Sequence, residues 1–597
     1  MQNVYMGYNA NRRIPEVVIR RIYMKALKKV LCITLALMLA GLALMAPVAA
    51  ATDVPLVVVQ GFAAIPLVKN AGTEQELQVF PPENLATDGF VAKLTTALIT
   101  GFIEYGANGA NWDSFGKRVL PVVKEMLADI AYNTDGTPVN DNVTHDTYDE
   151  PMSSYTEEEK KTIFTAFGLK YAEQYNEDLV YAFGYDWRQS PIDCADQLND
   201  FISYVKARTG SNKVNVVAIS QGSAVTLAYL AQYGGSDINN LVFASPAWQG
   251  TSLAGDAFTG NIDIDVYAFE NFMVGMSDGS ATTHIIAVLL SSLATSEEFT
   301  EEWFLILEKA IEGMEPRIYS DIIVPMLAGM PGLWCLVPND YYLDAKAFLF
   351  PEGVDADLLA KIDAYNEIQT NAKQIIEDAE DAGMKFAIVC GYNRQIAPIN
   401  DNLNTSDMVV DTKYASGGAT CADYLTAFSD WDFGGKGSYT QAKPDGHFHI
   451  SWDYKIDAST CMFPEQTWFI KNLQHVAYGT YEDDGTCDIV MWLLSMKKQH
   501  TVFTDKENYP QFSLYNTYKR FTKGINVDTY LGDVNHDYLL DTRDARLALK
   551  MAAGLVDIPE DEDKKVIIDA NEDGEISTDD ARYILCWAAG ISTDELY

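Results

Sequence analysis

Basic side chains are scarce in this sequence. Lysine and arginine number 43 against 84 aspartate and glutamate residues, which gives a formal net charge of -41 at pH 7. Nucleic-acid-binding proteins need basic residues to contact phosphates, and anionic membranes attract basic segments. The charge therefore argues against nucleic-acid binding and against simple electrostatic docking on an anionic membrane. Abundant carboxylates are instead suited to calcium binding.

Cysteine and histidine are also scarce. The sequence has eight cysteines with no CxxC spacing, and Cys32 lies in an N-terminal apolar run. The odd number that remains indicates neither a disulfide framework nor a zinc site. Only seven histidines are present, so the search for a histidine that acts as a base is short.

Long apolar runs are missing beyond the N-terminus, so we expect the mature chain to be soluble. The one long run, residues 30–45, follows a basic segment at 24–29 and precedes small residues at 46–51. This order is typical of a secretory signal peptide. We predict a leader over residues 1–51 whose secretory signal peptide begins at about Met24, with cleavage near Ala50 or Ala51. An uncleaved membrane anchor is the alternative.

Near the middle of the chain, a strand-like run leads directly into a helix-like run. Residues 214–219 are mostly apolar, Ser220 follows them, and a helix pattern begins at once. Ala218 and Gly222 supply the small residues that a sharp turn around a nucleophile requires. Such a turn exposes the serine hydroxyl and leaves the Gln221 N–H at a helix N-terminus. The pattern predicts a nucleophile elbow; the alternative is a buried serine at an ordinary junction.

Alternating strand and helix patterns surround the elbow, and they predict a mostly parallel sheet covered by helices on both faces. The predicted buried strands lie at 54–59, 179–183, 214–219, 240–244, 384–390 and 467–471. Residues 250–385 interrupt this alternation and are rich in apolar and aromatic side chains. We interpret them as a helical cap over the active site, which would suit an acyl or lipid substrate; a second structural subdomain is the alternative.

A serine nucleophile needs a histidine base that is oriented by a carboxylate, in the chain order Ser, Asp or Glu, His. His475 directly follows the last predicted strand and is the preferred base, with His447 and His449 in reserve. Asp407 is the preferred carboxylate and Asp411 is its reserve. The N–H groups of Phe62 and Gln221 are the candidate oxyanion donors, because they follow the first strand and the nucleophile.

The segment Tyr185-Asp186-Trp187-Arg188, followed by a helix and Ala218-Ile219-Ser220-Gln221-Gly222, resembles the lecithin:cholesterol acyltransferase family. The resemblance covers residues 54–250 well and 385–480 loosely. It implies an α/β-hydrolase with a lid that acts on ester bonds of lipids. The elbow departs from the family, which usually has Gly and His where this chain has Ala218 and Gln221.

The C-terminus contains an acidic loop twice, 36 residues apart, and each copy leads into a similar helix. Oxygen ligands at loop positions 1, 3, 5, 7, 9 and 12 suit Ca²⁺, which takes six or more oxygens. The candidate ligands are Asp533, Asn535, Asp537, Leu539, Asp541 and Asp544 in the first loop, and Asp569, Asn571, Asp573, Glu575, Ser577 and Asp580 in the second. Leu539 and Glu575 would contribute backbone carbonyls. Two acidic turns without a cation are the alternative.

The repeated loops resemble a type I dockerin, which implies calcium-dependent docking to a cohesin module of a scaffold protein. We therefore predict an α/β-hydrolase domain over 52–499, a linker over 500–530 and an all-α dockerin over 531–597. The predicted function is a secreted, scaffold-attached serine hydrolase that cleaves carboxylic esters of lipid or polysaccharide and needs no cofactor for catalysis. The alternatives are a lipid O-acyltransferase and a catalytically silent hydrolase-fold binding module.

Overall fold

The computed structural model divides into two units, Met1–Thr52 and Asp53–Tyr597. It describes residues 54–81, 90–109, 111–263, 301–424, 426–428, 449–451, 455–475, 486–506, 508–515, 521–522 and parts of 532–588. The predicted leader lies outside the described residues. In the part of the chain that is described, no helix is both long and apolar enough to cross a membrane.

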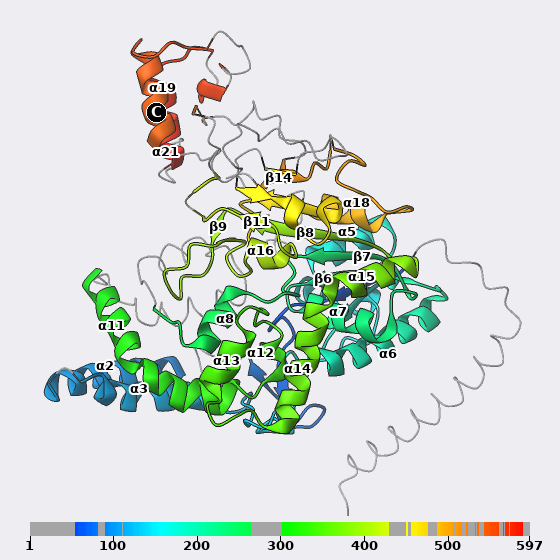
Figure 1. Cartoon of the computed structure of the whole chain (residues 1–597), viewed down its shortest axis with the longest axis vertical. Helices are drawn as coiled ribbons and strands as arrows, with labels where there is room; N and C mark the ends of the chain where they lie inside the picture. Colours follow the sequence, from blue (N-terminus) through cyan, green and yellow to red (C-terminus); the bar gives the residue numbers. More distant parts are fainter. Residues whose placement is uncertain are drawn as a thin grey trace, which may run out of the picture. The chain divides into compact units, whose positions relative to one another are not determined.

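An eight-stranded sheet forms the centre of the second unit, in the order β15-β14-β13-β8-β7-β6-β1-β5 (Figure 1). Its strands are β1 (Leu56–Val59), β5 (Val180–Phe183), β6 (Val214–Ile219), β7 (Ile238–Ala244), β8 (Lys385–Tyr392), β13 (Thr467–Lys471), β14 (Phe512–Tyr515) and β15 (Phe521–Thr522). All neighbours pair in parallel except β14 and β15. The predicted mostly parallel sheet and its six predicted strands are confirmed.

Successive residues of each strand point to opposite faces of the sheet, and both faces are buried. In β1, Val57 and Val59 belong to one apolar cluster, whereas Leu56 and Val58 belong to another. This explains why the strands appear in the sequence as continuous apolar runs rather than as alternating ones.

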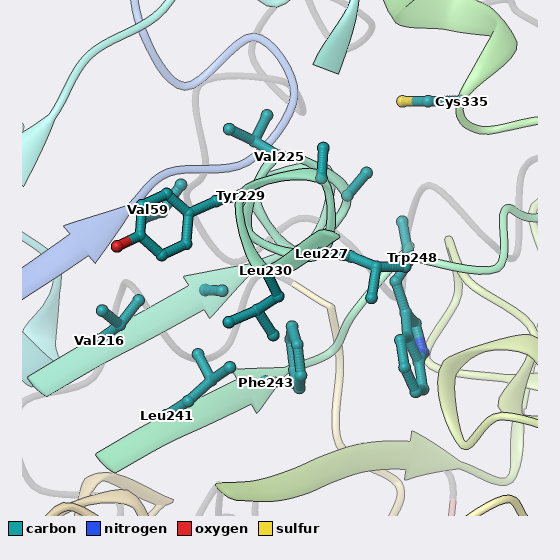
Figure 2. Packing of buried hydrophobic residues seen from close by; sticks show 14 of the residues in the cluster. Val59, Val216, Val225, Leu227, Tyr229, Leu230, Leu241, Phe243, Trp248 and Cys335 are labelled. Carbon is teal, nitrogen blue, oxygen red and sulfur yellow. The ribbon is translucent and has the colours of Figure 1, made fainter. Parts of the chain in front are cut away.

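The first face is covered by α6 (Pro191–Thr209), α7 (Gly222–Tyr233), α14 (Ala356–Thr370) and α15 (Ala372–Asp381). Figure 2 shows how α7 meets the strands: its apolar side chains lie over those of β1, β6 and β7. The second face is covered by α5 (Ala166–Gln174) and α18 (Thr486–Leu494), which pack against each other. Because helices cover both faces of the sheet, the loops that follow the ends of the strands are the part of the sheet left to form a site.

The predicted cap, residues 250–385, divides into two kinds of structure. Its last two helices, α14 and α15, pack against α7 and complete the helical layer of the sheet. Earlier, α11 (Glu301–Ile318) packs against α3 (Trp112–Leu127), which packs against α2 (Phe90–Ala107) (Figure 1). Helices from two insertions thus form one helical group. Residues 264–300 of the predicted cap lie outside the described residues.

Shorter elements connect these layers. They are β2 (Leu67–Lys69), β3 (Leu77–Phe80), β4 (Val143–His145), η1 (Met152–Ser154), α4 (Glu157–Ile163), η2 (Glu177–Leu179), α8 (Ser252–Thr259), η3 (Tyr319–Leu327), α12 (Pro331–Trp334), α13 (Tyr342–Leu349), β9 (Arg394–Gln395), β10 (Thr405–Ser406), α16 (Thr412–Ala415), β11 (Thr420–Cys421), β12 (Ile456–Asp457), η4 (Ala458–Thr460) and η5 (Pro464–Gln466).

The predicted linker over 500–530 is wrong for the residues that form β14. This strand pairs in parallel with β13, and the ring of Phe512 stacks on that of Phe469 at 5.4 Å. The Trp468 indole N–H also donates to the Tyr509 carbonyl oxygen at 3.1 Å. The aromatic residues of this stretch are therefore sheet and core residues, and the domain that contains the sheet extends beyond the predicted boundary at 499.

At the C-terminus, α19 (Thr542–Ala552) and α21 (Thr578–Ala588) follow the two acidic loops. The two helices pack against each other around Ala548 and Ile584, which are completely buried. The repeat in the sequence therefore corresponds to a repeat of helices that share one small apolar core.

Candidate active site

Ser220 lies at the turn between β6 and α7, where the chain adopts a strained conformation. Its φ angle is 52°, which non-glycine residues rarely adopt. A Cβ on Gly222 would lie 2.4 Å from the Gln60 carbonyl oxygen, so the close approach of α7 to β1 requires glycine there. Ala218 is completely buried in β6 and fits the position where glycine is commoner. The turn has the geometry of a nucleophile elbow.

Asp407 and His475 form a hydrogen-bonded pair. The Nδ1 atom of His475 lies 2.8 Å from Asp407 Oδ2, and the His475 backbone N–H donates to the Asp407 carbonyl oxygen at 2.8 Å. Asp407 is completely buried, and its Oδ1 accepts the N–H groups of Val409 at 3.1 Å and Val410 at 2.8 Å. These bonds fix the carboxylate, which fixes the imidazole through Nδ1. Nε2 is then the nitrogen available to exchange a proton.

The strand order brings the elbow and this pair to the same edge of the sheet. Ser220 follows β6, Asp407 follows β8 and His475 follows β13, and these strands are parallel within the consecutive set β13-β8-β7-β6. Gly391, near the end of β8, holds two of the loops close together. A Cβ on it would lie 2.7 Å from Asp407 Cβ and 2.8 Å from the Leu473 carbonyl oxygen.

The reserve carboxylate, Asp411, has a different set of partners. Its Oδ2 accepts the Ser252 N–H at 2.7 Å, and its Oδ1 accepts the Ser252 hydroxyl at 2.7 Å and the Asn404 amide at 2.6 Å. Asp411 therefore joins the start of α8 to the loop that carries Asp407. The structure pairs His475 with Asp407 and not with Asp411.

Of the two reserve histidines, the structure describes only His449, and it pairs this residue with neither aspartate. His449 is buried, and its Nδ1 lies 2.7 Å from the Gln511 side-chain oxygen. Gln511 in turn donates to the carbonyl oxygens of Pro464 at 2.7 Å and Thr467 at 3.1 Å. His449 thus belongs to the packing around β13 and β14. His447 lies outside the described residues.

The candidate oxyanion donors flank the serine. A Cβ on Gly61, which precedes Phe62, would lie 3.3 Å from Ser220 Oγ. Gln221 is the N-cap residue of α7, so its N–H lies at the positive end of the helix dipole. Within the described residues, neither the Phe62 N–H nor the Gln221 N–H donates to a protein acceptor. Both are thus available to a negatively charged oxygen.

The Tyr185–Arg188 segment contains a buried ion pair. In the sequence, this segment was only one of the motifs that resemble a known family, and no role was predicted for its side chains. Arg188 donates to both carboxylate oxygens of Asp186, at 2.9 and 2.6 Å, and both side chains are buried. Arg188 also donates to the carbonyl oxygen of Val143 at 3.2 Å. The spacing Asp-x-Arg directly after a buried strand was the available signal for such a pair.

The two C-terminal loops repeat one contact. The Asn535 N–H donates to Asp544 Oδ1 at 3.1 Å, and the Asn571 N–H donates to Asp580 Oδ1 at 3.3 Å. Asp544 and Asp580 are completely buried. A buried carboxylate at the last ligand position of each loop fits a calcium site, because burial of a carboxylate needs compensation.

Other candidate ligands are only partly described. Ser577 donates its N–H to Asp580 Oδ2 at 2.6 Å, and Gly574 donates its N–H to Asp569 Oδ2 at 2.8 Å. Asp533, Asp537, Leu539, Asp541 and Asp573 lie outside the described residues. Within the described part of the chain, no three His, Cys, Asp or Glu side chains are grouped to hold a metal. Glu575 is described but is expected to contribute only its carbonyl.

The match to one protein-family model agrees with this architecture. The family model described as "alpha/beta hydrolase fold" matches residues 166–315, which include β5, β6, the Ser220 turn and β7. A search of curated proteins gives no match. Eight chains of solved structures match, among them one from "The crystal structure of Tle4-Tli4 complex". That chain is 11% identical, the match covers 58% of this chain and 76% of that chain, and the TM-score is 0.25. This protein has an α/β-hydrolase fold with a mostly parallel central sheet.

Proposed function

We propose that this protein is a serine hydrolase that cleaves carboxylic esters through an acyl-enzyme. The observation that carries the proposal is the Asp407–His475 hydrogen bond of 2.8 Å at the sheet edge that also bears Ser220. A hydrogen-bonded pair of carboxylate and imidazole is the part of a serine hydrolase that activates the hydroxyl. A buried aspartate with no chemical role would not need a histidine from a loop 68 residues away.

The reaction would proceed in two steps. His475 Nε2 takes the hydroxyl proton as Ser220 Oγ attacks the ester carbonyl, and the proton then passes to the leaving alcohol. The developing oxyanion is stabilised by the Phe62 and Gln221 N–H groups. Water then attacks the acyl-enzyme by the same route, which releases the acid and restores Ser220. Asp407 holds the imidazole through Nδ1 and stabilises the imidazolium that forms.

The side chain of Phe62 supports an ester with an apolar acyl group. It is 38% exposed although it lies beside the oxyanion loop, and its ring contacts that of Trp187 at a centroid distance of 4.6 Å. An exposed aromatic ring at this place offers a surface for an acyl chain. Esters of lipids are therefore preferred over short acetyl esters.

A series of p-nitrophenyl esters from short to long acyl chains tests the proposal on the full-length protein. The Ser220→Ala variant should lose at least about 10⁴-fold in kcat. Ser245→Ala is the matched control, because Ser245 is also a buried serine at the end of a neighbouring strand, with a φ of 43°. It should keep the wild-type rate. Equal rates for wild type and Ser220→Ala would exclude this serine mechanism.

The same experiment separates the alternatives. If wild type releases the acyl group to an added long-chain alcohol in preference to water, the protein is an acyltransferase. If wild type is inert on every ester and on phospholipid, the hydrolase fold serves as a binding module.

We also propose that the protein is secreted and that its C-terminal repeat binds two Ca²⁺ ions and docks to a cohesin module. The repeated loop–helix units and the buried Asp544 and Asp580 support the calcium-binding and docking roles. The order of basic, apolar and small residues at 24–51 supports secretion. Calcium would supply the positive charge that holds each loop in shape. Binding to a panel of cohesin modules, with and without EDTA, tests it. A chain that binds no cohesin in calcium would contradict the docking role.

A further inference from the structure

The segment that follows β5 touches the loop that follows β1, because β5 and β1 are neighbouring strands. The Tyr185 hydroxyl donates to the Gln60 carbonyl oxygen at 2.8 Å, and Tyr185 is 1% exposed. Gln60 immediately precedes Gly61 and Phe62, which form the oxyanion loop. Tyr185 therefore holds a peptide group within two residues of a proposed oxyanion donor.

The Gln60 peptide is also restrained from other sides. Its side-chain amide donates to the Ile163 carbonyl oxygen at 2.6 Å. Its carbonyl oxygen faces Gly222, where a Cβ would approach to 2.4 Å. Without the Tyr185 hydroxyl, this carbonyl would be a buried acceptor that has lost its side-chain donor, and rotation of the peptide would become easier.

Trp187, two residues further on, contacts the side chains of both residues that carry the candidate oxyanion N–H groups. Its ring packs edge-on against that of Phe62, and its carbonyl oxygen accepts the Gln221 side-chain amide at 3.0 Å. The same amide donates to the Gly332 carbonyl oxygen at 2.7 Å. One short segment thus restrains Phe62 and Gln221, which are 159 positions apart in the sequence.

The segment itself is held by a buried ion pair. Arg188 donates three hydrogen bonds to the Asp186 carboxylate, two from its guanidinium and one from its backbone N–H, and it also donates to the Val143 carbonyl oxygen in β4. A buried pair of this kind contributes more to a unique geometry than to net stability. Tyr185 and Trp187 flank Asp186, so the ion pair fixes the backbone that carries both.

We propose that the Tyr185–Arg188 segment positions the N–H groups of Phe62 and Gln221 relative to Ser220. Tyr185 is the main positioning residue of this segment. The inference rests on the proposed function. Oxyanion donors act only when they match the position of the developing charge, and removal of one donor costs about 10²–10³-fold in kcat. Displacement of a donor by about 1 Å has an effect of about 10².

The test compares Tyr185→Phe with Tyr171→Phe in the full-length enzyme. Tyr171 is an equally buried tyrosine whose hydroxyl donates to the Val54 carbonyl oxygen, at the opposite end of β1 from the active site. Both variants lose a hydroxyl bond to a carbonyl that flanks β1, and Tyr171→Phe also loses the bond that its hydroxyl accepts from the Asn215 amide at 3.2 Å. The melting temperature of Tyr171→Phe should therefore fall at least as far as that of Tyr185→Phe. Only Tyr185→Phe should lower kcat, by about 10- to 100-fold, with KM within about twofold of wild type.

The affinity of a transition-state analogue distinguishes positioning from a merely structural role, because a substitution that only lowers stability would leave this affinity unchanged. An alkyl boronic acid forms a tetrahedral anion on Ser220 that occupies the oxyanion site. Its inhibition constant should rise in Tyr185→Phe by the same factor by which kcat falls. If Tyr185→Phe does not fold, Gln221→Met replaces it. This variant keeps the backbone N–H but removes the bond to Trp187, and it should show the same pattern.

Three results would overturn the proposal or its basis. If Tyr185→Phe keeps the wild-type kcat, as Tyr171→Phe should, Tyr185 does not position the oxyanion donors. If kcat falls while boronic acid affinity is unchanged, the loss has another cause and the proposal is wrong. If Ser220→Ala also keeps full activity, the proposed function itself fails, which is a separate outcome.

Discussion

Asp407 and Asp580 are both completely buried carboxylates, one at the edge of the central sheet and one in the first turn of α21. The side chain of Asp407 receives two backbone N–H bonds from its own loop, and its third partner is His475, which is distant in sequence. Asp580 is bound by Asn571 and Ser577, both within nine residues. The first site is assembled by the strand order, whereas the second is assembled by one loop and one helix.

Because of this difference, the two regions would obtain the positive charge that balances their carboxylates from different sources. The site formed by Asp407 and His475 depends on long-range packing. Its counter-charge would come from within the protein, since His475 would become cationic during the proposed reaction. The C-terminal loops contain many carboxylates and would acquire their counter-charge from Ca²⁺ in solution. Changes to one region should therefore leave the other intact, and the following predictions test that independence.

The largest effect is expected from Asp407→Asn. The amide keeps the shape of the carboxylate but favours the wrong imidazole tautomer and does not stabilise the imidazolium, so kcat should fall by about 10⁴-fold. Steady-state ester hydrolysis measures it, and near-UV circular dichroism checks that the fold is intact. Calcium binding by the C-terminal repeat should not change. A kcat within about tenfold of wild type would show that Asp407 is not the orienting carboxylate.

A smaller effect is expected from Asp580→Asn on calcium affinity. Loss of one charged ligand should weaken calcium binding to the second loop by about 10- to 100-fold. Calorimetric titration with Ca²⁺ measures this change, and Asp579→Asn, an exposed neighbour in the same turn, is the control. Ester hydrolysis should be unaffected by Asp580→Asn and by EDTA. Calcium binding of wild-type strength in Asp580→Asn would contradict the ligand assignment.

The smallest functional effect is expected from Asp411→Asn, which should change stability rather than catalysis or calcium binding. This variant loses part of the anchor between α8 and the Asp407 loop, so the free energy of unfolding should decrease by about 1–3 kcal/mol. Its kcat should stay within about twofold of wild type, because His475 is bound to Asp407. Urea denaturation and steady-state kinetics measure the two quantities. A loss of kcat comparable to that of Asp407→Asn would reverse the assignment of the two acids.

Much of this site was predictable from the sequence, because its residues follow apolar runs that can only be buried strands. The turn at Ser220 and the ends of β8 and β13 were found in this way. The structure places Asp407 and His475 together, as the preferred prediction had them. The choice between Asp407 and Asp411 could not be decided from the sequence, since both follow the same strand and both are buried. Only the positions of Ser252 and His475 distinguish them.

Other features of the structure could not be predicted from the sequence, because they depend on contacts between distant residues that leave no local pattern. β14 is four residues long, and it is a strand because β13 offers a free edge and Phe469 offers a ring to stack on. α14 and α15 were assigned to the cap because they follow a long irregular stretch, yet they pack on α7. The role of Tyr185 was hidden because its partner is a backbone carbonyl, which every residue has.

The extension of the sheet through β14 and β15 also shortens the segment that connects the hydrolase-fold domain to the C-terminal repeat. The chain stays bound to the sheet until Thr522, and the first repeated loop begins at Asp533, so covalent geometry limits the connecting segment to about 35 Å. The predicted linker over 500–530 would have allowed a far longer reach. If the repeat docks to a scaffold as proposed, the hydrolase can sample only a small volume around its anchor. Its neighbours on the scaffold would then decide which esters it meets.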